Sequence, residues 1–147
     1  MESTIALAVV CLLAAPAAAG GDPLANAIQK RLEQAGNLTF PMTPLSDYVG
    51  PGATLPESGF YVYAGLHSAQ SFTFSVLVYK TVAQAAAAYK AAVAQVHAIG
   101  GDFRAFNVRR VGRVLYTGAT AGAPSPSNPK LPVKAFHAMV ALAAGNV

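Results

Sequence analysis

The sequence predicts an α+β fold, in which two strand–strand–helix units form a four-stranded antiparallel sheet with helices packed on one face, preceded by an amphipathic helix. Segments rich in aromatic and β-branched residues occur in two pairs, at 60–66 with 71–80 and at 103–108 with 113–117. Each pair is followed by a segment whose apolar residues have helical spacing. Strand pairs that alternate with helices in this order are typical of the α+β class.

The first helix is predicted between Asp22 and Gly36. Asp22 can cap the helix, Pro23 fits its first turn, and Gly36 is a suitable residue to end it. The apolar residues between them share one stripe: Leu24, Ile28, Leu32 and Ala35. We therefore expect a short amphipathic helix that lies on an apolar surface.

Residues 38–59 contain four prolines and predict an irregular connection with at most one short edge strand. The strand at 71–80 has two alternating faces. One face is entirely apolar and consists of Phe72, Phe74, Val76 and Val78. This phenylalanine face is expected to be the core face. Tyr61 and Tyr63 share one face of the preceding strand. The sequence leaves open whether they are exposed for binding or covered by a helix.

The helix predicted at 81–99 is rich in alanine and ends at two glycines. Alanine favours the helix, and its small side chain allows the helix to lie close to a sheet. The stripe expected to be buried consists of Val82, Ala86, Tyr89, Val93 and Val96. Two glutamines, a lysine and a histidine interrupt the segment, so a membrane span is not expected.

The second strand pair is expected to turn around residues 109–112, where Gly112 can adopt a positive φ. A loop rich in Pro, Gly and Ser follows at 118–130. The last helix is predicted to begin near Pro132 and to end at Gly145. The residues that it is expected to bury are Val133, Phe136, Val140 and Ala143.

Residues 1–19 predict a signal peptide. The segment from Ile5 to Ala19 has no charge and ends in three alanines, as a cleavage site requires. It would span about 22 Å as a helix, less than the roughly 30 Å of a bilayer core. Cleavage would leave residues 20–147 as a single domain without cysteine, since Cys11 is the only one. A buried cytoplasmic helix is the alternative, because Glu2 stands where a basic residue is usual.

Basic charge is concentrated in the C-terminal third of the chain. Residues 103–147 contain six basic residues and no acid, whereas residues 20–102 contain four basic residues and five acids. The candidate ligand-binding residues are therefore Arg104, Arg109, Arg110, Arg113, Lys130 and Lys134. Guanidinium groups bind phosphate, sulfate or carboxylate through a planar fork of donors. The alternative is that these residues only solvate a sheet face and a hairpin tip, and so prevent edge-to-edge aggregation.

Between residues 60 and 144, the chain resembles small exported α+β domains of GC-rich bacteria. The resemblance lies in Val76–Tyr79, the alanine-rich helix, Arg110–Tyr116 and the final helix. Many of those domains are lipoproteins without an assigned activity, so the resemblance implies no catalytic residue. This chain differs from the lipoproteins because the residues before Cys11 do not form a lipid-attachment signal.

No motif indicates a cofactor or an established catalytic mechanism. His67, His97 and His137 lie far apart in the sequence, without the spacing of metal ligands. Ser127 and Lys130 match the S-x-x-K pattern of penicillin-recognising enzymes, but the S-D-N and K-T-G patterns that accompany it there are absent.

We therefore expect an exported, non-enzymatic binding or interaction domain without a cofactor. Outside the membrane its partner would be an anionic cell-envelope polymer, a lipid head group or an acidic protein. If residues 1–19 are retained, the alternative is a cytoplasmic nucleic-acid-binding domain, in which aromatic residues interleaved with the arginines stack on bases. Those aromatic residues are Phe103, Phe106 and Tyr116. A third alternative is a small serine hydrolase that uses Ser127 and Lys130.

Overall fold

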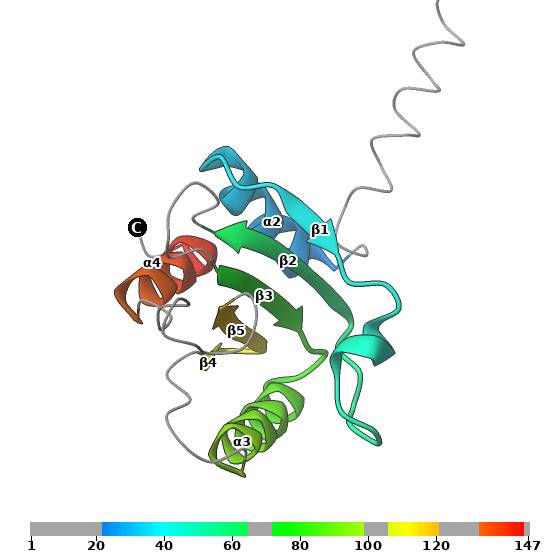
Figure 1. The fold of residues 1–147 in the computed structure, drawn as a ribbon. Helices are drawn as coiled ribbons and strands as arrows, with labels where there is room; N and C mark the ends of the chain where they lie inside the picture. Colours follow the sequence, from blue (N-terminus) through cyan, green and yellow to red (C-terminus); the bar gives the residue numbers. More distant parts are fainter. Residues whose placement is uncertain (1–21, 65–71, 99–105, 121–132, 146–147) are drawn as a thin grey trace, which may run out of the picture.

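A computed structural model describes residues 22–64, 72–98, 106–120 and 133–145. The elements in chain order are helix α2 (Pro23–Gln34), strand β1 (Thr39–Pro41), the 3-10 helix η2 (Leu45–Tyr48), strands β2 (Ser58–Ala64) and β3 (Phe72–Val78), helix α3 (Val82–Ala98), strands β4 (Phe106–Val111) and β5 (Val114–Thr120), and helix α4 (Val133–Ala144) (Figure 1). The predicted signal peptide lies outside the described residues. None of the helices in the described ranges has the length and the apolar run needed to cross a bilayer.

The α+β class is confirmed, but the sheet has five strands instead of the predicted four. Its order is β1-β2-β3-β5-β4, and every neighbouring pair is antiparallel. The two predicted hairpins, β2–β3 and β4–β5, lie side by side through the pairing of β3 with β5. The extra strand, β1, comes from the proline-rich connection and pairs with β2 over only three residues. It lies at the edge of the sheet, where a proline is tolerated because one side of the strand needs no partner.

The helices lie on both faces of the sheet, so the prediction that they all cover one face is wrong. Helices α2 and α4 pack on the face formed by the predicted apolar side of β3, and their core residues there include Ile28, Leu32, Phe136 and Val140. Helix α3 packs on the opposite face, where Ala85 contacts a cluster that contains Leu77 and Leu115. Strands β3 and β5 therefore present apolar side chains on both faces, and each face needs a cover.

Helix α3 does not bury the stripe that its sequence predicts. Val82 is 54% exposed and Tyr89 is 37% exposed, whereas Ala85 is fully buried. Ala88 packs beside Ala85 against the same cluster. The small alanine side chains allow the helix to approach the sheet closely, so the larger residues of the helix are left at its sides.

Helix α2 begins and ends where the sequence predicts, and its last turn is hydrogen-bonded to α4. Asp22 accepts hydrogen bonds from the backbone N–H groups of Leu24 and Ala25, at 2.8 and 3.3 Å. Gly36 follows the helix with a φ of 93°. From the last turn of α2, Arg31 donates a 2.6 Å hydrogen bond to the carbonyl of Ala143 near the end of α4. This contact satisfies one of the carbonyls that a helix C-terminus leaves free.

The hairpin between β4 and β5 turns at Gly112 and Arg113, slightly later than the sequence predicts. Strand β4 continues to Val111, which pairs with Val114, and Gly112 has a φ of 57°. A glycine with positive φ at the first of two turn residues matches the type II′ hairpin turn. Arg109 and Arg110 therefore belong to the strand and not to the hairpin tip.

Candidate functional site

Four of the six basic residues predicted to bind a ligand belong to the described part of the chain: Arg109, Arg110, Arg113 and Lys134. Arg104 and Lys130 lie outside it. Ser127, which the hydrolase alternative requires together with Lys130, also lies outside the described residues, so that alternative stays a prediction.

Arg109 and Arg110 lie on β4, which is the edge strand at the opposite side of the described sheet from β1. Arg109 is opposite Tyr116 and Arg110 is opposite Leu115 in the register with β5. Tyr116 belongs to the core under α2 and α4, and Leu115 to the cluster under α3. Because cross-strand partners share a face, the two arginines project to opposite faces of the same strand edge.

A hollow of about 420 Å³ extends over this edge. It is lined by Tyr89 of α3, by Val108, Arg109 and Arg110 of β4, and by His137 of α4. No acidic residue is among these lining residues. The hollow therefore presents two guanidinium groups and one imidazole to solvent, with no carboxylate among its described walls to neutralise them.

The two arginines differ in their freedom to reach a ligand. The side chain of Arg109 is exposed. Arg110 is half-buried, and its Nη1 donates a 2.8 Å hydrogen bond to the carbonyl of Gly112. A guanidinium has five N–H donors, so this bond leaves other donors of Arg110 for an anion. Lys134 is also exposed and lies three residues before His137, on the same side of α4.

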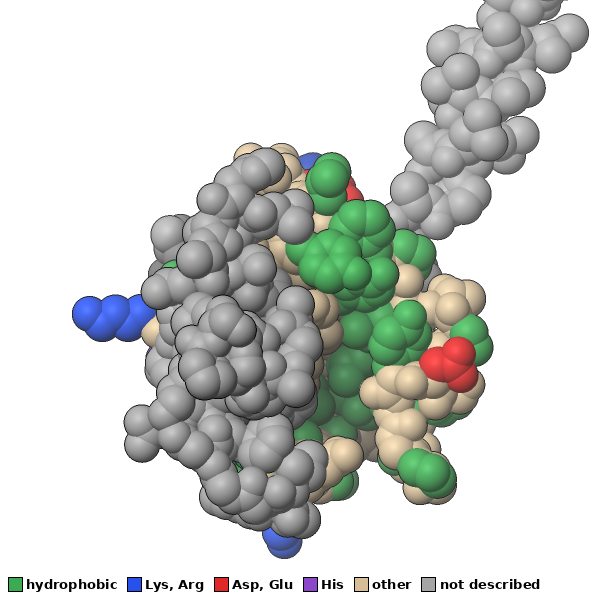
Figure 2. Space-filling view, in the orientation of Figure 1, with side chains coloured by type: hydrophobic (Ala, Val, Ile, Leu, Met, Phe, Trp, Pro, Cys, Tyr) green, Lys and Arg blue, Asp and Glu red, His purple; other side chains and the backbone are tan. Residues whose placement is uncertain are grey.

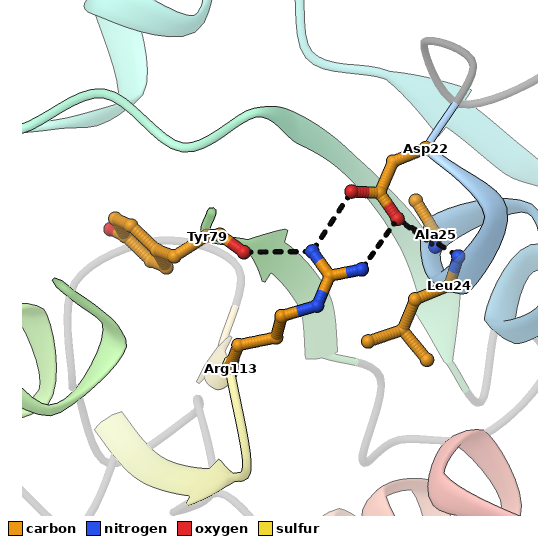
Figure 3. Close-up of polar contacts among 5 residues, drawn as sticks. All are labelled: Asp22, Leu24, Ala25, Tyr79 and Arg113. Carbon is orange, nitrogen blue, oxygen red and sulfur yellow. Dashed lines mark hydrogen bonds and ion pairs between the residues drawn. The ribbon is translucent and has the colours of Figure 1, made fainter. Parts of the chain in front are cut away.

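Arg113 is engaged within the fold. Its Nη1 and Nη2 donate hydrogen bonds of 2.9 and 3.1 Å to the two carboxylate oxygens of Asp22, and Nη1 also donates a 2.8 Å bond to the carbonyl of Tyr79 (Figure 3). Its side chain is 29% exposed, and that of Asp22 is 13% exposed. A bidentate contact of this kind fixes the geometry of both groups. We therefore assign Arg113 to the stability of the fold and not to the hollow.

The same contact changes the ionisation of both partners. The hydrogen bonds from Arg113, followed by those from the backbone of α2, lower the pKa of Asp22 below its ordinary value, although partial burial opposes this shift. The carboxylate in turn raises the pKa of Arg113. Both groups are thus held in their charged forms.

Tyr116 is not available to stack on a nucleic-acid base. Its side chain is 1% exposed, and its ring stacks on Phe74 with ring centroids 5.7 Å apart. Burial raises the pKa of this phenol to about 12. The nucleic-acid alternative requires Tyr116 to be an exposed aromatic residue among the arginines, and this part of the prediction is wrong. Phe103 lies outside the described residues.

Metal ions in proteins are usually held by side chains of His, Cys, Asp and Glu. Within the described ranges, no three of these residues gather in one place. Of the three histidines considered from the sequence, His137 has a described side chain, and this side chain is exposed on α4 as expected for a helix surface.

The sequence reasoning missed a second, larger hollow on the face of the sheet that α3 covers. It has a volume of about 660 Å³ and lies between α3 and the segment 48–54, over side chains of β3 and β5. Ser75 and Thr117 form part of its floor, and Gln84 and Gln95 are on its helical wall. The alternation of hydroxyl and apolar residues in β3 was visible in the sequence, but which part of that face stays uncovered depends on the position of α3.

No protein-family model, no curated protein and no solved structure that was compared with the chain matches it.

Proposed function

We propose that this chain is an exported, non-enzymatic binding domain that contacts an anionic polymer of the cell envelope through the edge strand β4. The observation that carries this proposal is the pair Arg109 and Arg110 on an edge strand, in a hollow whose described walls contain no acid. The uncharged N-terminal segment with its small-residue cleavage site supports export, which would bring this edge into contact with envelope polymers.

A polymer suits this edge better than a single small anion. Arg109 and Arg110 leave β4 toward opposite faces, so a ligand with anionic groups on both sides of this strand suits the pair better than one phosphate does. A chain with repeated phosphate or carboxylate groups can contact both, one on each side of β4. The exposed side chain of Lys134 is a further cation on the α4 side. Contacts of this kind depend on charge and weaken as salt is added.

Binding is proposed instead of catalysis because of the side chains that the hollow offers. Its described walls hold two arginines, one histidine, one tyrosine and one valine. A serine, threonine or cysteine nucleophile has to lie beside the histidine that activates it, and acid–base catalysis by carboxylates needs Asp or Glu. The described walls contain no such nucleophile and no carboxylate.

The test is to compare two double variants of residues 20–147. Arg109→Ser with Arg110→Ser removes two positive charges from the hollow, and Lys30→Ser with Lys80→Ser removes two exposed charges elsewhere. The probe is inorganic polyphosphate, titrated at several salt concentrations. The arginine variant is expected to lose at least tenfold in affinity and to show a shallower salt dependence. The lysine variant is expected to change by less than threefold.

Three other probes distinguish the alternatives. They are phosphatidylglycerol vesicles, polyglutamate and a single-stranded oligonucleotide. Tighter arginine-dependent binding of one of these than of polyphosphate would assign the edge to a lipid surface, an acidic protein or a nucleic acid, respectively. Equal losses of affinity for polyphosphate in the two double variants would mean that Arg109 and Arg110 contribute only to the overall charge of the protein.

A further inference from the structure

Three aromatic rings gather on the sheet face that carries the 660 Å³ hollow. The ring centroids of Phe40, Tyr61 and Tyr63 are 5.4–5.6 Å apart from one another. Phe40 is 36% exposed and Tyr63 is 45% exposed, whereas Tyr61 is half-buried between them and the cluster under α3, so the group is open to solvent at Phe40 and Tyr63. Figure 2 shows hydrophobic side chains gathered over β1 and β2 and continuing into a hollow beside the segment that joins these strands.

The register of the sheet connects these rings to the hollow. Phe40 is opposite Tyr61, Tyr61 is opposite Ser75, and Ser75 is opposite Thr117. Directly opposed residues have Cβ atoms about 5 Å apart and project from the same face. Aromatic rings on β1 and β2 are thus followed, in one row across the sheet, by two hydroxyl side chains on the floor of the hollow.

The described residues of this row and of the walls of the hollow carry no charge. The polar groups that they offer are hydroxyls and amides, including those of Tyr48, Ser75, Thr117, Gln84 and Gln95. The amide oxygen of Gln84 is buried and has no hydrogen-bond partner among the described residues. A buried acceptor without a partner is unfavourable, because it has lost its hydrogen bonds to water. A donor that entered the hollow, with a small movement of Gln84, would satisfy it.

These features discriminate between classes of ligand. An ionised ligand would leave water for a site without a counter-charge, which is unfavourable. A hydrocarbon would bury the hydroxyl and amide groups without hydrogen bonds, which is also unfavourable. A neutral sugar avoids both costs, because its ring has an apolar C–H face that can stack on an aromatic ring and a rim of hydroxyls that can donate and accept. Exposed aromatic patches beside polar groups are typical of binding sites.

We propose that this face binds a neutral oligosaccharide, with one sugar ring stacked on the exposed ring of Tyr63 and the following units in the hollow above Ser75 and Thr117. The hollow is of the size that small-molecule sites usually have, about 300–1,000 Å³. This site is distinct from the basic edge of β4. The edge is predicted to select for charge, whereas this face selects for an uncharged, hydroxylated ring.

The probes for this site are two uncharged oligosaccharides, the hexamers of glucose and of N-acetylglucosamine, titrated by calorimetry into residues 20–147. At least one hexamer is expected to bind. Tyr63→Ala is expected to weaken its binding at least tenfold, because this ring is exposed and its loss removes stacking area without opening the core. Tyr89→Ala is the matched control, since this tyrosine is similarly exposed but lines the hollow at β4. It is expected to leave hexamer binding unchanged.

A second measurement does not depend on any variant. In the wild-type protein, the bound hexamer should shift the amide NMR signals of Ser75, Thr117 and residues 48–54. The Arg109→Ser and Arg110→Ser variant should bind the hexamer normally, so the two sites can fail independently. The proposal is overturned if neither hexamer binds at millimolar concentration, if Tyr63→Ala has no effect, or if the neutral dye N-phenyl-1-naphthylamine occupies the hollow and no sugar displaces it.

Discussion

Arg113, in the turn between β4 and β5, binds the carboxylate of Asp22, the residue that caps helix α2. Asp22 lies 91 positions before Arg113 in the chain. The same guanidinium donates to the carbonyl of Tyr79 just after β3, and the carbonyl of Arg113 accepts a 2.9 Å hydrogen bond from the N–H of Tyr79. One side chain therefore joins the first described helix, the end of a central strand and the β4–β5 hairpin (Figure 3). This relationship explains why Arg113, which makes more of the hydrogen bonds than Arg109 or Arg110, is not available to a ligand.

The charge on Asp22 should therefore contribute to stability. Asp22→Asn keeps an oxygen that can cap α2 but removes the ion pair, and we expect it to lower the free energy of unfolding by about 1–2 kcal/mol. Asp22→Ala removes the cap as well and should cost about 1 kcal/mol more. Urea denaturation followed by circular dichroism measures both. The control is Asp47→Asn, an exposed carboxylate, which should change stability by less than about 0.5 kcal/mol. Equal effects of Asp22→Asn and Asp47→Asn would contradict the role of the pair.

The same contact predicts a dependence on pH. The pKa of Asp22 is lowered in the folded protein from an ordinary value of 3.8, chiefly by the hydrogen bonds from Arg113. A lowered pKa stabilises the fold above pH 3.8, and this contribution is lost as the pH falls through the folded value. The stability difference between the wild type and Asp22→Asn should thus be constant near neutral pH and shrink below pH 4. A difference that persists undiminished at pH 2 would show that the charge of Asp22 is not its source.

Much of the fold could be predicted from the sequence because local rules and tertiary contacts agree there. The cap at Asp22, the end of α2 at Gly36 and the core face of β3 were all predicted correctly. The connection at 38–59 was expected to hold at most one short edge strand, and β1 is such a strand. Its residues and its pairing with β2 were not predicted, because the pairing is a long-range contact and three residues carry no periodicity. The position of α3 was missed for a related reason. Its apolar residues surround the helix, so the sequence could not indicate which side faces the sheet.

The observed face of α3 can be tested with two leucine substitutions. Ala85 is fully buried against the sheet, so Ala85→Leu should force the helix outward and lower the free energy of unfolding by about 1–3 kcal/mol. Ala94 is exposed on the same helix, and Ala94→Leu should change the free energy of unfolding by less than about 0.5 kcal/mol. Thermal or urea denaturation provides the measurement. A larger loss for Ala94→Leu than for Ala85→Leu would mean that another side of α3 contacts the sheet.

Export is tested by the intact mass of the native protein from fractionated cells. We expect a mass that corresponds to residues 20–147, in a fraction outside the cytoplasm, because the uncharged segment ends in a small-residue cleavage site. All 147 residues in the cytoplasmic fraction would contradict this expectation and would favour the nucleic-acid alternative.

The candidate site was only partly predictable. The clustering of arginines in the sequence indicated the candidate residues, but it placed Arg109 and Arg110 in a turn and not on the edge strand β4, where they lie. It could not show that Arg113 is paired, because Asp22 is remote in the sequence. Nor could it show that Tyr89 and His137, on two different helices, line the same hollow. Those contacts depend on how α3 and α4 pack on opposite faces of the sheet.

The most direct test of the central proposal is an amide NMR titration of residues 20–147 with inorganic polyphosphate. The proposal predicts that shifts at low ligand concentration are confined to β4 and to α4 around His137, and that they are absent in the Arg109→Ser and Arg110→Ser variant. Shifts centred on α2 or spread evenly over exposed lysines would contradict it, since binding would then follow overall charge and not the edge of β4.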